Sequence, residues 1–307
     1  MSLLYKAVVT ENIEAVKLLL SHQNIDVNFL NFILNSQPNF SNFSSISQPD
    51  FHFTTLIAAI KRKYYTIIKL LLSHPNINAN IKSIKTKIFV PSQFAYLHPT
   101  IDVTKPKYKN TTKVKRKTEK TPLYMAVQMR NIKIVKLLLS NPSIDVNIKL
   151  VKTQFDEEEV ISEKTLLYLA VELNNEKIVN LLLSDPNIDV NIKCLYTHWK
   201  GSRQSLESPF YLAIKKQYLN CVKLLLSNQN IDVNSKVLHK TRKYFKESKS
   251  LLHQAVRRNN IQIVELLFKF KNIDDNTKDK NKKKPIDIAY DERMISLINE
   301  YTSSLGS

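Results

Sequence analysis

Glycine is nearly absent from this chain: its 307 residues include only Gly201 and Gly306. Phosphate-cradling and dinucleotide-binding loops need several glycines close together, because backbone N–H groups must approach the anion. The sequence therefore excludes the enzyme classes that depend on such loops.

Cysteine and long apolar runs are scarce as well. Cys194 and Cys221 are too few for a disulfide framework, and neither has a metal-ligand partner at close spacing. No run approaches the roughly 18 apolar residues that suggest a membrane span. Glu11 and Glu14 interrupt the N-terminal segment, which is unlike a signal peptide. We therefore expect no transmembrane insertion and a location in the cytoplasm or the nucleus.

Patterns that carry catalysis are missing too. The 7 histidines are scattered, and no HExxH motif, nucleophile elbow or paired ligand spacing occurs. His253 stands at a repeat position that holds tyrosine in other copies, and Cys221 stands at one that holds isoleucine. Both are expected to pack rather than to react. We predict a protein that is not an enzyme and has no catalytic, metal-binding or cofactor-binding residues.

What the chain does have is an internal repeat. The phrase LLLS, followed by a turn rich in Asn and Ile, recurs along the sequence. Self-similarity of this kind indicates a repeat architecture. A partial copy covers 284–301 near the C-terminal end. The full copies align without gaps and cover 2–28, 54–80, 121–147, 165–191, 208–234 and 250–276.

The third copy, TPLYMAVQMRNIKIVKLLLSNPSIDVN, predicts a pair of helices. Thr121 is a helix N-cap, and Pro122 suits the first helical position. Ala126 lets a second helix pack closely, and apolar residues at three- and four-residue spacing form the stripe of that helix. Asn141 and Pro142 end it. One such pair cannot bury its own apolar face, so stability must come from stacking on neighbouring copies.

These motifs resemble the ankyrin repeat. TPLYMA and SPFYLA each precede an LLL triplet and then IDVN, and SLLHQA opens a further copy. The resemblance covers all but the long insertions. It implies an all-α fold: one ankyrin-type helical repeat solenoid over 1–307, with projecting β-hairpin fingers, several of them extended. It also implies a macromolecule-binding scaffold, since ankyrin repeats mostly bind proteins.

The turns between paired helices depart from the family pattern, because other residues replace the usual glycine. Asn174 can hold the left-handed conformation that glycine supplies. Lys63, Arg130 and Gln217 do so less readily. We therefore expect the turns at these three residues to be reshaped.

The segments between copies are expected to form the fingers, with lengths of 25, 40, 17, 16, 15 and 7 residues in chain order. The long insertions are 29–53 and 81–120. Within the second, VPSQFA and HPTIDV echo the two ends of a repeat, so 81–120 is either a degenerate repeat or a mobile loop. After the last finger, two short helices are expected at Pro285–Tyr290 and Arg293–Tyr301.

Positive charge is concentrated in the fingers. The net charge is +19; the fingers carry −1, +9, −2, +2, +5 and +3 in chain order, and the remaining residues supply only +3. Projecting cations can steer acidic partners toward the protein. They can equally serve as a solvated surface that keeps the chain soluble.

A partner-binding surface is predicted where two basic features should meet. One is the pair of positions just past the repeated Ala of the first helix, which the family's geometry turns toward the concave face. The other is the two fingers that flank the fifth copy, in which cations stand beside aromatic residues. The predicted residues are Lys215, Lys216, Arg257, Arg258, Trp199, Lys200, Arg203, Lys240, Arg242, Lys243, Tyr244 and Phe245.

We expect the partner to be another protein with an acidic surface, bound by a monomeric chain. Two alternatives stay open. One is association with nucleic acid or an anionic membrane through the basic fingers. The other is a substrate-adaptor module of a larger enzyme or ligase assembly, because the chain begins inside a repeat with no capping helix before Ser2. Binding to DNA or heparin as salt is varied would separate these hypotheses.

Overall fold

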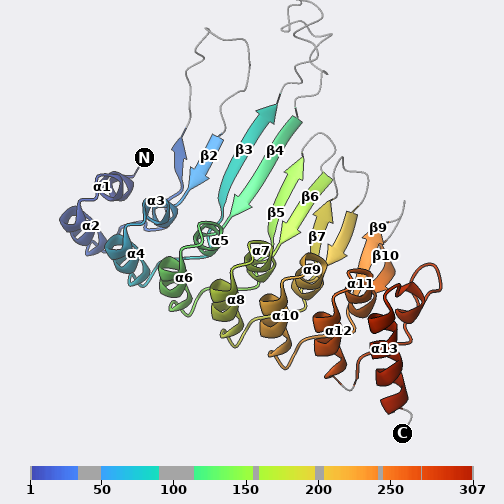
Figure 1. The fold of residues 1–307 in the computed structure, drawn as a ribbon. Coiled ribbons are helices and arrows are strands. Elements are labelled where there is room, and N and C mark those ends of the chain that lie inside the picture. Colours follow the sequence, from blue (N-terminus) through green and yellow to red (C-terminus); the bar gives the residue numbers. More distant parts are fainter. Residues whose placement is uncertain are drawn as a thin grey trace, which may run out of the picture. The chain divides into compact units, whose positions relative to one another are not determined.

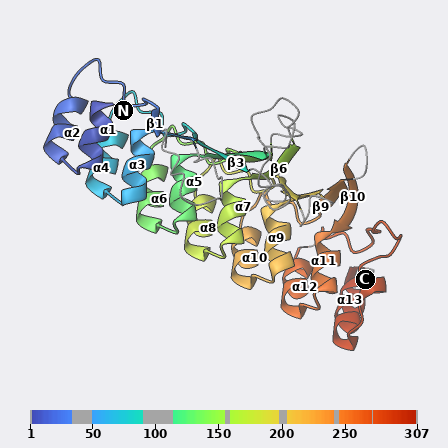
Figure 2. The same ribbon diagram turned by 90° about the horizontal axis from the view of Figure 1, so that it is seen from above.

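The computed structural model describes residues 2–33, 50–89, 114–154, 159–197, 204–240, 245–270 and 272–305. The chain divides into two compact units. Unit 1 comprises 1–145 with 150–162, and unit 2 comprises 146–149 with 163–307. Within each unit, paired helices follow one another in rows and strands extend from one side of them (Figures 1 and 2).

Each full copy of the repeat folds into two short helices joined by a tight turn, as the sequence predicts. Unit 1 holds α1 (Leu3–Val9) with α2 (Ile13–Leu20), α3 (Thr55–Arg62) with α4 (Tyr65–Leu72), and α5 (Pro122–Gln128) with α6 (Ile132–Leu139). Unit 2 holds α7 (Leu166–Glu172) with α8 (Glu176–Leu183), α9 (Pro209–Lys216) with α10 (Leu219–Leu226), and α11 (Leu251–Arg257) with α12 (Ile261–Phe268).

Like helices stack on like helices within each unit. In unit 1, α3 packs between α1 and α5, and α4 packs between α2 and α6. In unit 2, α9 packs between α7 and α11, and α10 packs between α8 and α12. The same leucine of the second helix is fully buried in copy after copy, which stabilises each stack by about 1.5–3 kcal/mol per side chain. These leucines are Leu71, Leu138, Leu182, Leu225 and Leu267.

The first helices begin where the predicted caps stand. In every copy, the hydroxyl oxygen of the cap residue accepts a hydrogen bond from the backbone N–H three residues later. This bond satisfies one of the N–H groups that the first turn leaves without a partner. The caps are Ser2, Thr54, Thr121, Thr165, Ser208 and Ser250.

The expectation that three turns would be reshaped is wrong. Lys63, Arg130 and Gln217 all adopt the left-handed conformation, with φ of 61°, 54° and 59°. The next residue then donates its N–H to the carbonyl of the repeated Ala, as in Tyr64 to Ala59 at 3.1 Å. A non-glycine residue in this conformation costs about 1–2 kcal/mol, which the closing hydrogen bonds and the packing of both helices offset.

The first five fingers are antiparallel hairpins, whereas the last, 277–283, contains no strand. Neighbouring hairpins also pair with each other. One sheet has the order β1 (Asn31–Ile33), β2 (Asp50–Phe53), β3 (Ser83–Phe89), β4 (Val114–Lys120), β5 (Leu150–Gln154) and β6 (Glu159–Lys164). The other has the order β10 (Phe245–Ser250), β9 (Lys236–Lys240), β8 (Gln204–Glu207) and β7 (Cys194–Thr197). The sequence predicted the hairpins but not this lateral pairing.

The two ends of insertion 81–120 form the longest hairpin, in which Ser83 pairs with Lys120 and Phe89 pairs with Val114. The echoes of a repeat at 90–95 and 98–103 lie outside the described residues. The choice between a degenerate repeat and a mobile loop therefore remains open for that part.

The C-terminal pair differs from the prediction. Only a short 3-10 turn, η4 (Ile286–Ile288), stands where a first helix was expected, because the backbone is already extended at Ala289. The second helix, α13 (Glu292–Leu305), is longer than expected. It packs on α12, and the rings of Phe268 and Tyr301 stack with centroids 4.0 Å apart.

The Asn that closes the IDVN-like turn links each of the first five copies to the next. In unit 1, the side chain of Asn28 donates to the carbonyl of Asn76 and accepts from the N–H of Asn78, at 2.7 and 2.8 Å. Asn80 makes the same two bonds in unit 1. In unit 2 they recur at Asn147, Asn191 and Asn234. An amide suits this position because it donates and accepts at once.

Candidate partner-binding surface

One side-chain pair recurs at the base of the fingers. The pair consists of the last residue of a finger and the residue eight positions later, near the end of the first helix. Eight residues are a little over two helical turns, so the two residues lie on the same side of that helix. We call these two residues a finger-base pair. The finger-base pairs are Phe53/Lys61, Lys120/Gln128, Lys164/Glu172, Glu207/Lys215 and Lys249/Arg257.

In four copies the finger-base pair forms an internal contact. The Lys61 ammonium lies 5.4 Å from the centroid of the Phe53 ring. The Lys120 ammonium donates to Gln128 Oε1 at 2.7 Å. Two further pairs are salt bridges, with Lys164 Nζ 2.6 Å from Glu172 Oε2 and Lys215 Nζ 2.9 Å from Glu207 Oε1.

Lys215, one of the predicted contact residues, therefore has its charge compensated inside the protein. Glu207 is almost fully buried, with 2% of its side chain exposed. It also accepts a hydrogen bond from the Ser205 hydroxyl at 2.8 Å. The Lys215 ammonium lies 4.7 Å from the centroid of the Tyr196 ring. A buried carboxylate needs such a partner, so Lys215 stabilises the finger base in addition to any role at the surface.

The sixth copy differs, because both residues of its finger-base pair are cations. Lys249 is partly buried at the end of β10, and Arg257 is exposed at the end of α11. Among the residues that the structure describes, Lys249, Arg257 and Arg258 take part in none of the salt bridges. The pKa of Lys249 is lowered, first by burial and second by the charge of Arg257.

The structure places four basic side chains of unit 2 at the ends of two packed helices and the adjoining strand. Lys216 ends α9, and Arg257 and Arg258 stand at the end of α11, which packs against α9. All three are exposed. We call Lys216, Lys249, Arg257 and Arg258 the basic face of unit 2.

The finger tips of the predicted surface are only partly placed. Lys240 ends β9, is exposed, and pairs in the sheet with the backbone of Phe245. The other predicted finger residues lie outside the described part of the chain: Trp199, Lys200, Arg203, Arg242, Lys243 and Tyr244.

The sequence reasoning missed a basic cluster in unit 1. The pKa of Lys120 is lowered by burial first and then by the charges of Lys85 and Lys61. The pKa of Lys61 is lowered by burial and then by Lys85 and Arg62. These lysines come from α3, β3 and β4. In the sequence, only the +9 charge of the second finger indicated such a cluster. The register that places Lys85 opposite Thr118 could not be predicted.

The buried thiols and His253 are engaged in packing. Burial raises the pKa of Cys194, and it raises the pKa of Cys221 to about 11. The two ring nitrogens of His253 lie 2.8 Å from the Ser250 hydroxyl and 2.9 Å from the Lys283 carbonyl. Within the described ranges, no three His, Cys, Asp or Glu residues are grouped as a metal site would require. No described helix has both the length and the apolar character needed to span a bilayer.

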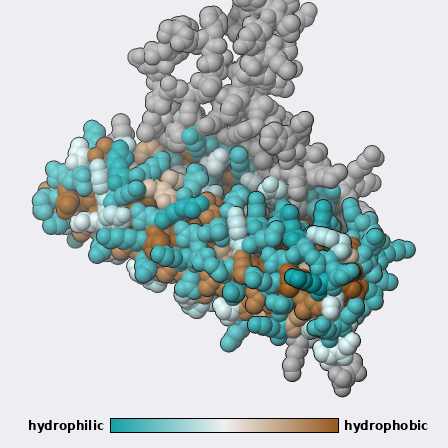
Figure 3. All heavy atoms as spheres, viewed as in Figure 1, coloured by the Kyte–Doolittle hydropathy of each residue, from teal (hydrophilic) through white to brown (hydrophobic). Residues whose placement is uncertain are grey.

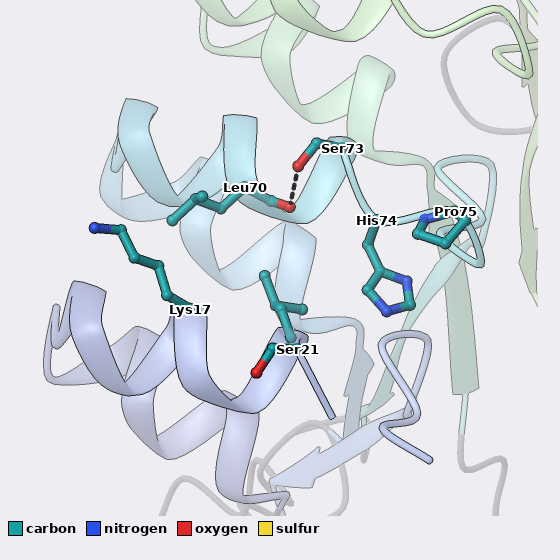
Figure 4. Close-up of a pocket in the computed structure, with 7 residues that line it drawn as sticks. Lys17, Ser21, Leu70, Ser73, His74 and Pro75 are labelled. Atoms are coloured by element: carbon teal, nitrogen blue, oxygen red, sulfur yellow. Dashed lines mark hydrogen bonds between the residues drawn. The ribbon is translucent and has the colours of Figure 1, made fainter. Parts of the chain in front are cut away.

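A shallow cavity of about 270 Å³ lies between α2 and α4 of unit 1 (Figure 4). Its polar groups are used locally: the hydroxyls of Ser21 and Ser73 donate to the carbonyls of Leu18 and Leu70. His74 Nδ1 accepts from the N–H of Asn76 at 3.2 Å. These contacts hold the ends of α2 and α4 and the turn that follows α4.

The face shown in Figure 3 is mostly hydrophilic, and the hydrophobic residues on it form small, separate patches. Large contiguous apolar patches mark hydrophobic docking sites. The described residues on this face offer no such patch.

Comparison with known proteins agrees with this architecture. A family model described as ankyrin repeats in three copies matches residues 101–194, 150–237, 192–279 and 210–299. The crystal structure of the ankyrin repeat domain of Bcl-3, a member of the IkappaB family, is 18% identical, with a TM-score of 0.58, covering 97% of this chain and 98% of that chain.

The human ASB11 ankyrin repeat domain is 16% identical, with a TM-score of 0.47 and 98% of each chain covered. No curated protein sequence matches the chain. At these identities the likeness to solved structures concerns the fold alone. The predicted fold class, a helical repeat solenoid with β-hairpin fingers, is confirmed.

Proposed function

The chain belongs to the ankyrin repeat family, and from that premise we propose that it is a non-catalytic scaffold that binds another protein. The partner carries an acidic surface and contacts the basic face of unit 2, with the neighbouring fingers at its rim. Family membership supports the protein class of the partner, because ankyrin repeats generally serve as protein-binding scaffolds.

One observation supports the basic face above other surfaces of unit 2. The finger-base pairs of the fourth and fifth copies neutralise themselves, whereas the sixth presents Lys249 and Arg257 together. The packed helices and the sheet fix where these cations start, so binding them requires no rearrangement of the backbone. Complementary charge also raises the rate of association with an acidic partner.

Association with nucleic acid is the competing hypothesis, since the basic cluster of unit 1 and the fingers are both cationic. Phosphate binding would release counterions and give a steep salt dependence on any sequence. The adaptor hypothesis is a special case of the scaffold, in which the bound protein is delivered to an enzyme assembly. Identification of the partner decides between these readings.

The test begins with affinity capture by the full chain from its native cells and identification of bound proteins by mass spectrometry. The triple variant Lys216→Glu, Arg257→Glu and Arg258→Glu is then compared with the wild-type chain for binding the captured partner. We expect weaker binding and a flatter salt dependence. Lys215 is left intact, because its loss would leave the buried carboxylate of Glu207 without its cation.

The matched control reverses three exposed lysines on the second-helix side of unit 2: Lys177, Lys223 and Lys269. It changes the net charge by the same amount. Equal weakening in both triple variants, or unchanged affinity in the first, would contradict the proposal. Binding of duplex DNA that competes with the captured partner would favour the nucleic-acid hypothesis instead.

A further inference from the structure

The finger base of unit 2 is built to hold a carboxylate next to a cation. In the fourth copy the acid, Glu172, comes from the helix and the lysine from the finger, with N···O distances of 2.8 and 2.6 Å to its two oxygens. In the fifth copy the acid, Glu207, comes from the finger, and Lys215 contacts both of its oxygens at 2.9 and 3.1 Å. The same position therefore accepts a carboxylate from either side.

The sixth copy keeps the N-cap and the eight-residue spacing of this arrangement and lacks the acid, and the register of β10 against β9 shifts between Glu247 and Lys249. Ser250 caps α11 as Thr165 and Ser208 cap α7 and α9, so Lys249 and Arg257 occupy the two positions of the finger-base pair. The lowered pKa of Lys249 is consistent with a partly buried ammonium beside a second cation.

The nearby Asp279 forms none of the salt bridges among the described residues, so it does not pair with Lys249 as Glu207 pairs with Lys215. It acts on Lys249 electrostatically. However, its Oδ1 accepts hydrogen bonds from the backbone N–H groups of Asn281 and Lys283, at 2.7 and 3.1 Å. Those bonds hold the turn of the last finger.

We propose that Lys249 and Arg257 form a receptor site for one carboxylate side chain, an Asp or Glu supplied by the acidic protein partner. The inference rests on the proposed function and specifies the contact at its centre. The incoming carboxylate takes the role that Glu172 and Glu207 have in the two preceding copies, where each neutralises the lysine of its finger-base pair. Arg257 is suited to pair with both carboxylate oxygens, and Lys249 adds a point charge from the finger side.

Three single substitutions would each reproduce, in the sixth copy, a finger-base pair that another copy of this chain already has. Arg257→Glu recreates the Lys164/Glu172 pair of the fourth copy. Lys249→Glu recreates the Glu207/Lys215 pair of the fifth. Arg257→Gln recreates the Lys120/Gln128 hydrogen bond of the third. Each substitution gives the remaining cation an internal partner, so the fold is expected to be retained.

The experiment measures binding of the full chain to fluorescein-labelled poly-L-glutamate by anisotropy, at two salt concentrations. We expect Arg257→Glu and Lys249→Glu each to weaken binding by about tenfold, the effect of losing one charge-assisted contact. Arg257→Gln should weaken it less, because it removes one charge and leaves Lys249 hydrogen-bonded. Lys223→Glu on α10 matches the charge change of the first two variants and should bind like the wild-type chain.

The outcomes separate this inference from the proposed function. If Lys223→Glu weakens binding as much as Arg257→Glu, net charge alone governs binding; the receptor site is then overturned while the scaffold stands. If the wild-type chain does not bind poly-L-glutamate but binds duplex DNA, both the proposed function and the inference are wrong. Thermal melting of each variant checks the fold, and Lys249→Glu and Arg257→Glu provide independent tests of one site.

Discussion

Two positions of the repeat behave very differently along the chain. The core leucine of the second helix is the same residue in successive copies and is fully buried in the second to sixth copies. The finger-base pair differs between copies: it is a cation–ring contact in the second copy and a hydrogen bond in the third. In the fourth and fifth copies it is a salt bridge, with the acid on the helix in one and on the finger in the other. In the sixth copy both residues are cations. Packing between copies tolerates little change of shape. A pair at the rim of the helices can change its chemistry while the fold is kept.

The largest effect should come from the core position. Leu138→Ala should lower the free energy of unfolding by about 2–5 kcal/mol, because it leaves a cavity between stacked helices. Leu18→Ala is the matched control, since Leu18 is 74% exposed in the same unit. Chemical denaturation of both variants measures the difference. A cost below about 1 kcal/mol for Leu138→Ala would show that this leucine does not hold the stack together.

A smaller effect is expected at the buried finger base of the fifth copy. Lys215→Met leaves the carboxylate of Glu207 without its cation and should cost about 1.5–3 kcal/mol. Lys164→Met breaks the more exposed pair of the fourth copy and should cost at most about 1 kcal/mol. Denaturation curves of the two variants compare the pairs directly.

The exchanged double variant Glu207→Lys with Lys215→Glu sharpens this comparison. It reproduces the direction of the Lys164/Glu172 pair and should recover most of the stability that Lys215→Met loses. No recovery would show that the position is specific for the orientation of the pair, and not only for its opposite charges.

The sequence predicted what local hydrogen bonds and periodicity determine. Thr121 and Pro122 start α5, and Leu138 lies in the core, because caps and apolar spacing act over a few residues. The turn at Lys63 was predicted wrongly, because the propensity of one residue was given more weight than the bonds that close both helices.

The surface was harder to predict for a different reason. The pairing of Lys215 with Glu207 joins the end of a finger to the end of a helix, at a spacing of eight that ordinary helical patterns do not include. The cluster of Lys61, Lys85 and Lys120 depends on the register within the β3/β4 hairpin and on the pairing of β3 with β2 of the preceding hairpin. These pairings join residues far apart in the sequence, so no single copy of the repeat reveals them.

Alkaline pH should lower the stability of the fold through a buried thiol of the core. Burial raises the pKa of Cys221 to about 11, so the folded chain holds this proton more tightly than the unfolded chain does. Stability should therefore fall as pH rises from about 9 to 11, by about 1 kcal/mol for each of these pH units from this group. Cys221→Ala should show a shallower fall in denaturation experiments. Identical slopes for the two chains would contradict the assignment.

The smallest effect concerns the sixth finger base, and it tests the geometry without any partner. Arg257→Glu replaces two neighbouring cations by the salt bridge of the fourth copy, so it should raise the free energy of unfolding by about 0.2–1 kcal/mol. The gain should shrink at high salt, because Arg257 is exposed and its charge is screened. Lys223→Glu, with the same change of net charge, should raise stability less. A loss of stability in Arg257→Glu, or an equal gain in both variants, would mean that Lys249 and position 257 do not meet as the finger-base pairs of the other copies do.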